Sequence, residues 1–472
     1  MQNMNFYNDD KLKEECGVIG IYEKNNINTS VLAYHGLIAL QHRGQESAGL
    51  AVKNDGIITC YKEMGLVSEV FDDKILNLLK GDSSIGHVRY STTGESFVTN
   101  AQPLVVKYKN GTIALAHNGN LVNAHALRRE MEDQGMIFTT SIDSEIIACL
   151  IAKNYKDNID DAITRTMDLI RGSYSLVIMT NDELIGVRDK HGLRPLVLGM
   201  LGEGYVLASE TCALDTLGAK FVRDVNPGEI IIIDEKGLRS IQTEPEEKAA
   251  CIFEYIYFAR PDSIIDGISV YGSRENAGRI LAKEQPADAD LVICVPDSGT
   301  PAAIGYAKES GIPYTIGLIK NRYIGRTFIQ PTQETREMGV TLKLNPLKKQ
   351  IEGKRIVMVD DSIVRGTTSK KIVQALRDAG AKEVHVRVSS PMVIHSCYFG
   401  IDTQRSGELM GASNLLEMIK EKIDADSLGY LSYEGLLESV SSEGKGFCTA
   451  CFNGKYPVDI TEDCDKHVFE RR

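Results

Sequence analysis

Residues 356–369, "IVMVDDSIVRGTTS", constrain the fold more than any other segment of the chain. Four consecutive apolar residues predict a buried strand, and Asp360 and Asp361 follow where this strand should emerge from its sheet. A turn and a crossover helix then lead to a second predicted strand at 384–388, and residues 291–313 have the same strand, loop and helix order. This order predicts a parallel α/β sheet, whose ligands bind where strand C-termini meet helix N-termini.

The loop after the first of these strands suits a phosphorylated ligand. Its glycine, its hydroxyl groups and the free N–H groups at a helix N-terminus all favour an anion. Two aspartates beside a phosphate call for a hard cation between them, and Mg²⁺ fits. Paired aspartates that merely end a strand and cap a helix are the structural alternative, but both features in one loop favour a ligand site.

The first half of the chain has a different pattern. From residue 16 to about 243, short β-rich segments are broken by Gly and Asn, with helical stretches near 121–134 and 143–154. This pattern predicts α+β layers rather than a βαβ series. The polar stretch at 240–250 is the best linker, and it predicts that the 472 residues form two domains, 16–245 and 246–472.

Composition excludes several classes of protein. The net charge of −12 argues against nucleic acid as a partner, because binding would need a basic face. No uncharged apolar run is long enough for a transmembrane helix, so we expect no membrane association. The first 15 residues lack the apolar core of a secretory signal, so we expect a cytoplasmic protein. Its ten cysteines would then stay reduced and need an explanation other than disulfides.

Cys16 stands between an acidic leader and an apolar run, and it is either a small core residue or a nucleophile. Polar residues elsewhere favour the second interpretation. Arg89 can pair with an α-carboxylate, and Asp143 suits an α-ammonium group. The Asn118 side chain and the Gly119 N–H can face a developing oxyanion. Carboxylate, ammonium and amide together describe glutamine.

The nucleophile would also need a base. No Cys–His pair is evident, because His87 and His117 lie in apolar segments where histidines are usually structural. A free α-amino group can serve if the nucleophile is the first residue of the mature chain. Cleavage of the bond between Glu15 and Cys16, which removes residues 1–15 as a propeptide, would provide it.

These segments resemble the class II, N-terminal-nucleophile glutamine amidotransferases. The motifs "CGVIGIY", "QHRGQESAGLAV", "GHVRYSTTG", "AHNGNLVN" and "DSE" occur in the order of that family and span residues 16–240. The resemblance implies an αββα sandwich in which Cys16, Asn118 and Gly119 are catalytic and Arg89 and Asp143 bind glutamine. It also implies three residues at the domain junction: Arg43, Tyr90 and Tyr257.

The later loop resembles the phosphoribosylpyrophosphate (PRPP) motif of type I phosphoribosyltransferases. The resemblance implies that Asp360 and Asp361 meet the ribose hydroxyls and Mg²⁺, with Ser298 of "VPDSGTP" near the metal. It implies that Lys320 and Arg322 lie in a mobile loop that closes over PRPP. The residues implied to contact PRPP around its 5-phosphate are Arg365, Gly366, Thr367, Thr368 and Ser369.

Together the resemblances imply an enzyme that releases ammonia from glutamine, carries it internally and displaces pyrophosphate from C1 of PRPP. The products would be 5-phosphoribosylamine and glutamate, in the first step of purine synthesis. The resemblance further implies feedback inhibition by purine nucleotides and a homotetramer. Alternatives are glucosamine-6-phosphate synthase or asparagine synthetase, which would need different second domains, and a non-catalytic PRPP-sensing regulator, which would not need the first.

The other cysteines form two groups. Cys448 and Cys451 make a CxxC pair, and Cys251 and Cys397 are potential distant ligands. Four thiolates suit Zn²⁺ or an iron–sulfur cluster, and spacing alone also allows ordinary buried cysteines. One branch of PRPP-using amidotransferases has a cleaved leader and a structural [4Fe–4S] cluster, and the resemblance implies such a cluster at these four positions, with Cys464 as a spare candidate. The cysteines that we expect in cores are Cys60, Cys149, Cys212 and Cys294.

Overall fold

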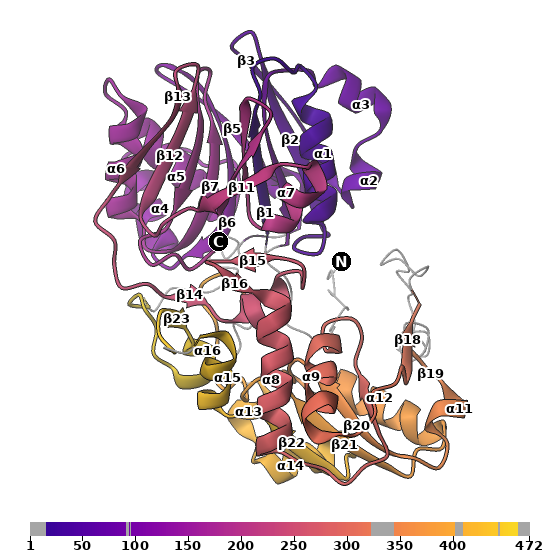
Figure 1. Cartoon of the computed structure of the whole chain (residues 1–472). Helices are drawn as coiled ribbons and strands as arrows, with labels where there is room; N and C mark the ends of the chain where they lie inside the picture. Colours follow the sequence, from indigo (N-terminus) through magenta and orange to yellow (C-terminus); the bar gives the residue numbers. More distant parts are fainter. Residues whose placement is uncertain are drawn as a thin grey trace, which may run out of the picture.

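The computed structural model describes residues 16–90, 94, 96–321, 344–401, 409–441 and 444–460, and it forms two lobes (Figure 1). The first lobe contains two antiparallel sheets, and the second contains a parallel sheet with helices. Between the lobes lie short strands, among them β14 (Ala250–Cys251) and β23 (Phe447–Cys448), which pair in parallel.

The two sheets of the first lobe have seven and six strands. Neighbouring strands run antiparallel, and β1 lies between β10 and β4. In spatial order, the first sheet contains β11 (Lys220–Asp224), β9 (Val197–Leu201), β10 (Gly204–Ala208), β1 (Gly17–Tyr22), β4 (Ser83–Arg89), β2 (Ser47–Asn54) and β3 (Ile57–Met64). The second contains β13 (Gly237–Gln242), β12 (Glu229–Asp234), β8 (Leu184–Arg188), β7 (Gly172–Met179), β6 (Gly111–Leu121) and β5 (Leu104–Tyr108).

Three apolar cores hold these layers together. Side chains from both sheets, such as Val18 and Val177, fill the core between them. A second core lies under α1 (Thr29–Ala39) and α7 (Thr211–Leu217), and a third lies under three helices of the other face. Those helices are α4 (Ala124–Asp133), α5 (Asp143–Asn154) and α6 (Ile159–Leu169). The predicted αββα sandwich is confirmed.

Two local differences from the sequence prediction have simple causes. The helix predicted near 121–134 begins only at Ala124, because β6 continues through Leu121 and ends beside β7. Helix α1 was not predicted, because its sequence "TSVLAYHGLIA" is apolar on most sides and lacks an amphipathic stripe. The structure buries six of its residues.

The second lobe contains four parallel strands in the order β17, β20, β21 and β22, which confirms the predicted α/β sheet. Cys294 at the end of β17 pairs with Val359 of β20, so the loops after both strands begin side by side. The strands are β17 (Leu291–Cys294), β20 (Arg355–Asp360), β21 (Glu383–Val388) and β22 (Ser427–Tyr430). Helices around the sheet include α8 (Val270–Glu284), α9 (Thr300–Ser310), α12 (Thr367–Asp378), α14 (Leu416–Ile423) and α15 (Tyr433–Val440).

Shorter elements complete the fold. The first lobe has α2 (Val67–Val70), α3 (Asp73–Leu78) and a 3₁₀ turn at Val98–Asn100. The junction has the π-helix η2 (Glu254–Phe258), β15 (Ile264–Ile265) and β16 (Ile268–Ser269). The second lobe has β18 (Leu318–Lys320), β19 (Leu344–Pro346), α11 (Lys348–Ile351), α13 (Met410–Ser413) and α16 (Ala450–Asn453). None of the described helices has the length and apolar character that a membrane crossing needs.

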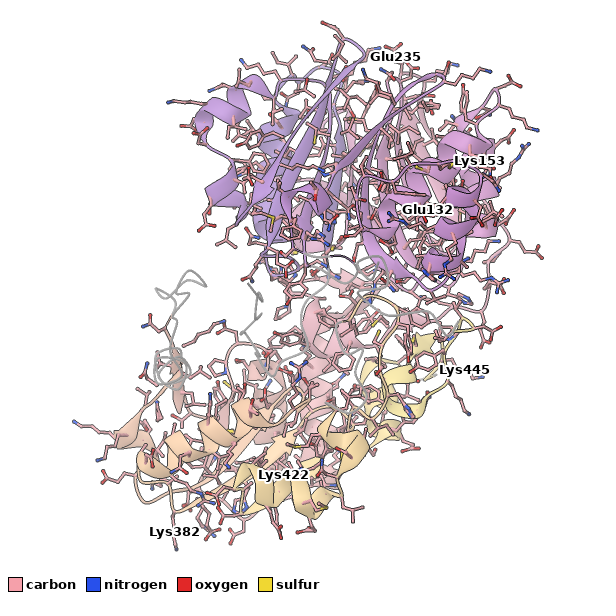
Figure 2. All side chains as sticks on the ribbon, turned by 180° about the vertical axis from the view of Figure 1, so that it is seen from behind. Glu132, Lys153, Glu235, Lys382, Lys422 and Lys445 are labelled. Atoms are coloured by element: carbon pink, nitrogen blue, oxygen red, sulfur yellow. The ribbon has the colours of Figure 1, made fainter. Side chains whose placement is uncertain are left out.

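Charged side chains are distributed differently on the outside and at the junction. Figure 2 shows Glu132 and Lys153 on the outer surface of the first lobe and Lys382 and Lys422 on that of the second. At the junction, charges are buried in pairs instead. The Arg188 guanidinium, for example, donates to both carboxylate oxygens of Asp266, at 2.8 and 3.0 Å.

Gly20 faces the second sheet at close range, and replacing it tests the packing of the two sheets. A Cβ at this position would lie 2.5 Å from a Val177 methyl and 3.0 Å from a Leu184 methyl. We expect Gly20→Ala to destabilise the first lobe by about 1–3 kcal/mol through overpacking. Urea unfolding followed by circular dichroism measures the change.

Gly272→Ala is the matched control, because Gly272 is half-buried in the first turn of α8 and its Cβ would meet Ser269 only at an ordinary 3.4 Å. Alanine stabilises a helix more than glycine does, by up to about 1 kcal/mol, so this variant should be as stable as the wild type or more stable. Equal unfolding midpoints for both variants would show that the sheets are not tightly packed at Gly20.

Candidate active sites

Cys16 lies at one end of the sandwich, directly before β1. Its side chain is 6% exposed, and its Sγ donates to the carbonyl oxygen of Tyr90 at 3.4 Å. Gly17 pairs with Val88, so Cys16 is next to the end of β4, where Arg89 is buried. The structure therefore brings the predicted nucleophile and the predicted carboxylate-binding arginine to the same edge of one sheet.

Asn118 and Gly119 come from β6 of the other sheet. The Asn118 side chain is 1% exposed, and its amide nitrogen finds no hydrogen-bond acceptor among the described residues. Gly119 has a φ of +151°, and a Cβ there would lie 2.1 Å from the Ser173 carbonyl oxygen. A buried amide donor without a partner is costly unless a ligand accepts its hydrogen bond.

Asp143 begins α5 and is held in place by neighbours on β6. Its Oδ2 accepts a hydrogen bond from the Leu121 N–H at 2.9 Å, and its Oδ1 lies 3.6 Å from Nδ1 of His117. Burial alone would raise the pKa of this carboxyl, but His117 and the N–H groups of Leu121 and Ser144 lower it below its ordinary value. Asp143 is therefore an anion at neutral pH.

The environment of Cys16 does not favour its thiolate. Burial raises the pKa of the thiol to about 11, an effect that Arg89 opposes and that Glu46 and Asp143 reinforce. His87 offers no help as a base, because burial lowers its pKa to about 3 and its Nε2 is hydrogen-bonded to the His117 carbonyl, 2.9 Å away. The His87 side chain connects the two sheets, and the His117 side chain contacts Ser144 and Ser173 within its own layer, so both histidines make structural contacts of the kind their apolar surroundings predicted.

The second site lies at the carboxyl ends of β17 and β20. Asp360 and Asp361 are both buried, and the Asp361 N–H donates to Oδ1 of Asp360 at 2.9 Å. The Ser362 hydroxyl donates to Oδ1 of Asp361 at 2.7 Å, and the Ser298 hydroxyl donates to its Oδ2. The structure thus brings the predicted acids and Ser298 together, and two serine hydroxyls contact the Asp361 carboxylate.

Gly366 begins the helix that follows these acids. Its φ of +79° and the 2.3 Å that would separate a Cβ from Cε of Met410 both require glycine. Helix α12 therefore begins at Thr367 without an N-cap side chain, next to the acid pair. Ser369 is buried, and Thr367 faces outward.

The remaining predicted residues of this site are placed unevenly. Arg365 directly precedes Gly366 and Thr368 follows it by two residues, and both are partly exposed. The ammonium of Lys320 pairs with Asp297 of the loop after β17 at 3.1 Å. Arg322 lies outside the described residues, as do residues 1–15 and Cys464.

Sequence reasoning missed a buried charge cluster at the junction. The guanidinium of Arg43, a predicted junction residue, donates to Glu210 at 2.5 Å and to both carboxylate oxygens of Glu254 at 2.6 and 3.0 Å. Tyr257, also predicted there, lies on η2 together with Glu254. Arg43 is in the "QHRGQESAGLAV" motif, but nothing in the sequence indicates which distant acids pair with it.

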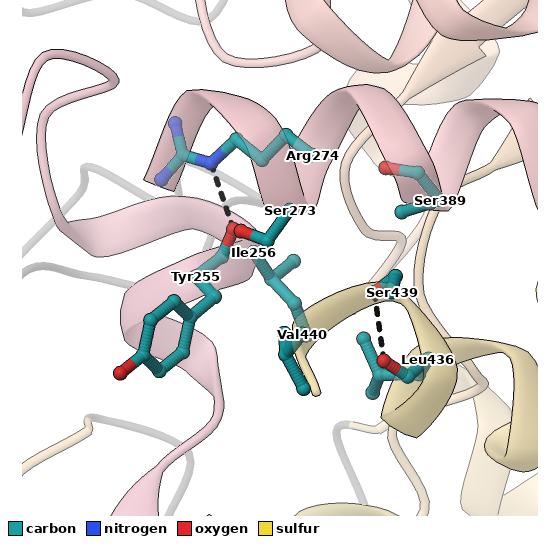
Figure 3. A pocket seen from close by; sticks show the side chains of 9 residues that line it. Tyr255, Ile256, Ser273, Arg274, Ser389, Leu436, Ser439 and Val440 are labelled. Carbon is teal, nitrogen blue, oxygen red and sulfur yellow. Dashed lines mark hydrogen bonds between the residues drawn. The ribbon is translucent and has the colours of Figure 1, made fainter. Parts of the chain in front are cut away.

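A small cavity lies beside η2, as Figure 3 shows. Ser273 and Arg274 of α8, Ser439 of α15 and Ser389, which follows β21, contribute to its wall. Arg274 donates a hydrogen bond to the Tyr255 carbonyl at 2.9 Å. Burial lowers the pKa of Arg274 to about 10, although the negative charge of Asp361 acts in the opposite direction and raises it. The cavity is therefore between the junction helix and the carboxyl ends of the parallel sheet.

The four cysteines proposed as ligands converge. Cys251 and Cys448 are paired across β14 and β23, and together with Cys397 and Cys451 they line one cavity. The Phe399 N–H donates to Sγ of Cys397 at 3.4 Å. In the described part of the chain, no three His, Cys, Asp or Glu side chains meet closely enough to hold a single metal ion.

The other cysteines are packed as core residues to different degrees. Cys212 and Cys294 are buried, as predicted. Cys60 and Cys149 are half-buried and pack against the edges of two cores of the first lobe. All nine described cysteines are free thiols.

Comparisons with known proteins agree with both halves. A glutamine amidotransferase domain model matches residues 87–216, and a phosphoribosyl transferase domain model matches residues 268–390. An amidophosphoribosyltransferase from Archaeoglobus fulgidus is 54% identical over 95% of this chain and 100% of its own length. The relative of the same name from Bacillus subtilis is 50% identical over 96% of both chains.

Solved structures agree as well. The glutamine PRPP amidotransferase from B. subtilis, complexed with ADP and GMP, matches with a TM-score of 0.90 and 49% identity over 95% of this chain and 98% of that one. A structure described as the allosteric regulatory enzyme of purine biosynthesis matches with a TM-score of 0.92 and 49% identity, over 96% of this chain and 99% of that one.

Fold and site together define a glutamine amidotransferase joined to a phosphoribosyltransferase. The identity over nearly the whole length makes the assignment more specific. The chain belongs to the amidophosphoribosyltransferase family.

The reaction of this family is the first step of purine biosynthesis. The amide nitrogen of glutamine replaces pyrophosphate at C1 of PRPP, which gives 5-phosphoribosylamine, pyrophosphate and glutamate. The presence of both halves and the identity to enzymes of this name do not favour a non-catalytic regulator or another class II amidotransferase.

Proposed function

We propose that Cys16 is the nucleophile that attacks the glutamine carboxamide. The buried Asn118 amide without a partner is the observation that carries this proposal, because a tetrahedral oxyanion is an acceptor that would satisfy it. The Gly119 N–H is the second donor to the oxyanion. Arg89 holds the α-carboxylate of glutamine, and Asp143 holds its α-ammonium group.

We propose that the base is the α-amine of Cys16 itself, set free when residues 1–15 are removed as a propeptide. A thiol with a pKa of about 11 needs a proton acceptor, and the described histidines nearby are engaged in structural contacts. The α-amine takes the thiol proton as Sγ attacks the amide carbon, and it returns a proton to the leaving ammonia. Water then hydrolyses the thioester to glutamate. The mature chain would divide into 16–245 and 246–472.

We propose that PRPP binds over the carboxyl ends of β17 and β20. Asp360 and Asp361 accept hydrogen bonds from the ribose hydroxyls, and Lys320 and Arg322 neutralise pyrophosphate as it leaves. The oxygen atoms of the two acids and Ser298 suit Mg²⁺, which when bound would neutralise part of the pyrophosphate charge. The 5-phosphate is held by Arg365, Gly366, Thr367, Thr368 and Ser369.

We propose that ammonia passes between the sites through the interior of the junction. The cavity in Figure 3 supports this proposal, because its wall includes Arg274, which interacts electrostatically with Asp361, and Tyr255 of η2. Three serine hydroxyls in the wall offer hydrogen bonds to a small polar molecule. An interior route keeps ammonia from being protonated in water before it reaches C1.

We propose that Cys251, Cys397, Cys448 and Cys451 hold one structural [4Fe–4S] cluster. Convergence on one cavity supports this proposal, because a [4Fe–4S] cluster needs four thiolates around one space. Burial and the neighbouring thiols raise the pKa of Cys451, so positive charge from iron would be needed to deprotonate it. When bound, the cluster would fix segments from both sides of the junction.

The comparisons also support a proposal on regulation. The B. subtilis relative was solved with ADP and GMP, so we propose purine nucleotides as feedback inhibitors of this enzyme. We further propose a homotetramer. Nine described free thiols suit a reducing compartment, and on that ground we propose the cytoplasm.

Replacing the nucleophile should separate the two half-reactions. We expect Cys16→Ala to reduce glutamine-dependent formation of phosphoribosylamine by more than about a thousandfold, because alanine removes the sulfur that attacks the amide. With ammonium salts as the nitrogen source, the same variant should retain wild-type turnover. Pyrophosphate release measured with each nitrogen source tests both expectations.

Cys212→Ser is the matched control, because Cys212 is also buried in the same lobe but lies on α7, within the core of that side. It should use glutamine as the wild type does. Substantial glutamine use by Cys16→Ala would show that another residue is the nucleophile.

Asp360→Asn tests the second site. The loss of one carboxylate weakens binding of the ribose and Mg²⁺, so both nitrogen sources should lose activity equally, by about 10- to 1000-fold. Hydrolysis of glutamine to glutamate, measured without PRPP, should be unchanged. Asp378→Asn, at the far end of α12, is the control and should behave as the wild type. If only the glutamine-dependent activity fell, Asp360 would act in the hydrolysis of glutamine and the proposed PRPP role would be wrong.

Cys451→Ser tests the cluster. The wild type purified without oxygen should absorb visible light and contain about four irons per chain, and this variant should lose both. The control Cys294→Ser should keep them, because Cys294 is buried beside Thr300 and Tyr314 instead. Bound zinc, or iron lost only from Cys464→Ser, would overturn the ligand assignment.

A further inference from the structure

The carbonyl group of Cys16 has a dedicated donor. Nε of Arg43 donates to this oxygen at 3.2 Å, and the Arg43 side chain is fully buried. Gly17 makes the contact possible, because a Cβ there would lie 2.9 Å from Val88 and 3.2 Å from Leu40. The backbone just after Cys16 therefore lies directly against the turn that carries Arg43.

The remaining donors of Arg43 point to two acids from different parts of the chain. Nη1 donates to Glu210, which precedes α7 in the first lobe. Nη1 and Nη2 together donate to Glu254 in a bidentate pair at 3.0 and 2.6 Å. Glu210 also accepts hydrogen bonds from the Ser263 hydroxyl and from the Arg260 N–H, so its position does not depend on Arg43 alone. Glu254 is the partner that fixes the plane of the guanidinium.

Glu254 is positioned by the second lobe. It begins η2, in which the carbonyl groups of Glu254 and Tyr255 accept hydrogen bonds from the buried guanidinium of Arg274, and the carbonyl of Ala259 just after the helix accepts a third. Arg274 belongs to α8, which packs closely on α9 beside the parallel sheet. The chain of contacts thus runs from α8 through Glu254 and Arg43 to the carbonyl of Cys16.

We propose that Glu254 is a positioning residue for the nucleophile. This inference rests on the proposed role of Cys16. An N-terminal residue has no preceding peptide bond to hold it, so the backbone on its carbonyl side has to position its α-carbon. Anchoring the carbonyl through Arg43 fixes the peptide plane between Cys16 and Gly17, and with it the place and direction of the Cα–C bond from which the amine and Sγ project toward the substrate. The second lobe thereby supplies part of the glutaminase site's rigidity.

A purely structural role is the competing explanation, because buried ion pairs commonly hold domains together. Arg188 and Asp266 provide the comparison. They also form a buried bidentate pair across the junction, but Arg188 donates to carbonyls of residues 192, 194 and 225 and not to Cys16. Loss of either pair should loosen the junction, and only loss of the Glu254 pair should disturb the nucleophile.

The experiment compares Glu254→Gln with Asp266→Asn in the whole enzyme after removal of residues 1–15. We expect Glu254→Gln to lower kcat with glutamine by about 10- to 100-fold, with an unchanged KM for glutamine. Inactivation by iodoacetamide should slow in parallel, because it reports the orientation of the thiol and its amine. Turnover with ammonium salts should be unchanged. Asp266→Asn should leave the ratio of glutamine-dependent to ammonia-dependent turnover at the wild-type value.

Glu254→Asp is the second variant in case Glu254→Gln does not fold. It keeps the charge, but one methylene less weakens the bidentate contact, so a smaller loss in the same parameters is expected. The proposal would be overturned if a folded Glu254 variant kept the wild-type ratio of glutamine-dependent to ammonia-dependent turnover. It would also be overturned if Asp266→Asn lowered that ratio as much as the Glu254 variant does. If Cys16→Ala retained glutamine use, the proposed nucleophile would be wrong instead, and the two failures are therefore distinguishable.

Discussion

Face-to-face packing of the two antiparallel sheets is the constraint on which the first site depends. Because β1 and β4 belong to one sheet and β6 to the other, Cys16 and Arg89 meet Asn118 and Gly119 only if the sheets lie in one alignment. The close approach at Gly20 and the hydrogen bond between His87 and the His117 carbonyl fix that alignment. The core that stabilises the lobe therefore also assembles its site.

The second site follows a simpler rule. Parallel strands end at the same edge, so the loops after β17 and β20 are neighbours once Cys294 pairs with Val359. Ser298 then reaches Asp361, and Gly366 turns the chain so that α12 points its N-terminus to the same place. The acids and the helix N-terminus are adjacent in sequence, which is why this site was easy to recognise.

The junction joins the two sites and contains what sequence patterns could not predict. Glu210 and Glu254 are far from Arg43 in the chain, and each of these two acids looks like an ordinary surface charge in the sequence. Their burial makes the interaction strong, since little water screens it. The segment after Cys397 makes a second contact between the lobes. The carbonyl of Tyr398 accepts a hydrogen bond from Asn120, and the carbonyl of Phe399 accepts one from Ser173. The proposed cluster would therefore be directly connected to the strand of the oxyanion donors.

The sequence by itself determined the two fold classes and most of the candidate residues. Strand periodicity, the paired aspartates and the ordered motifs are local signals, and local signals survive in a one-dimensional pattern. It could not predict α1, whose apolar faces lack a stripe, or decide which of the cysteines converge. Only the tertiary structure decided that the buried Asn118 amide nitrogen has no hydrogen-bond acceptor among the described residues. It also decided that Arg43 reaches the carbonyl of Cys16 and that Glu210 and Glu254 hold that arginine. These features depend on burial and on contacts between segments up to 211 residues apart, and such contacts exist only after the layers have packed.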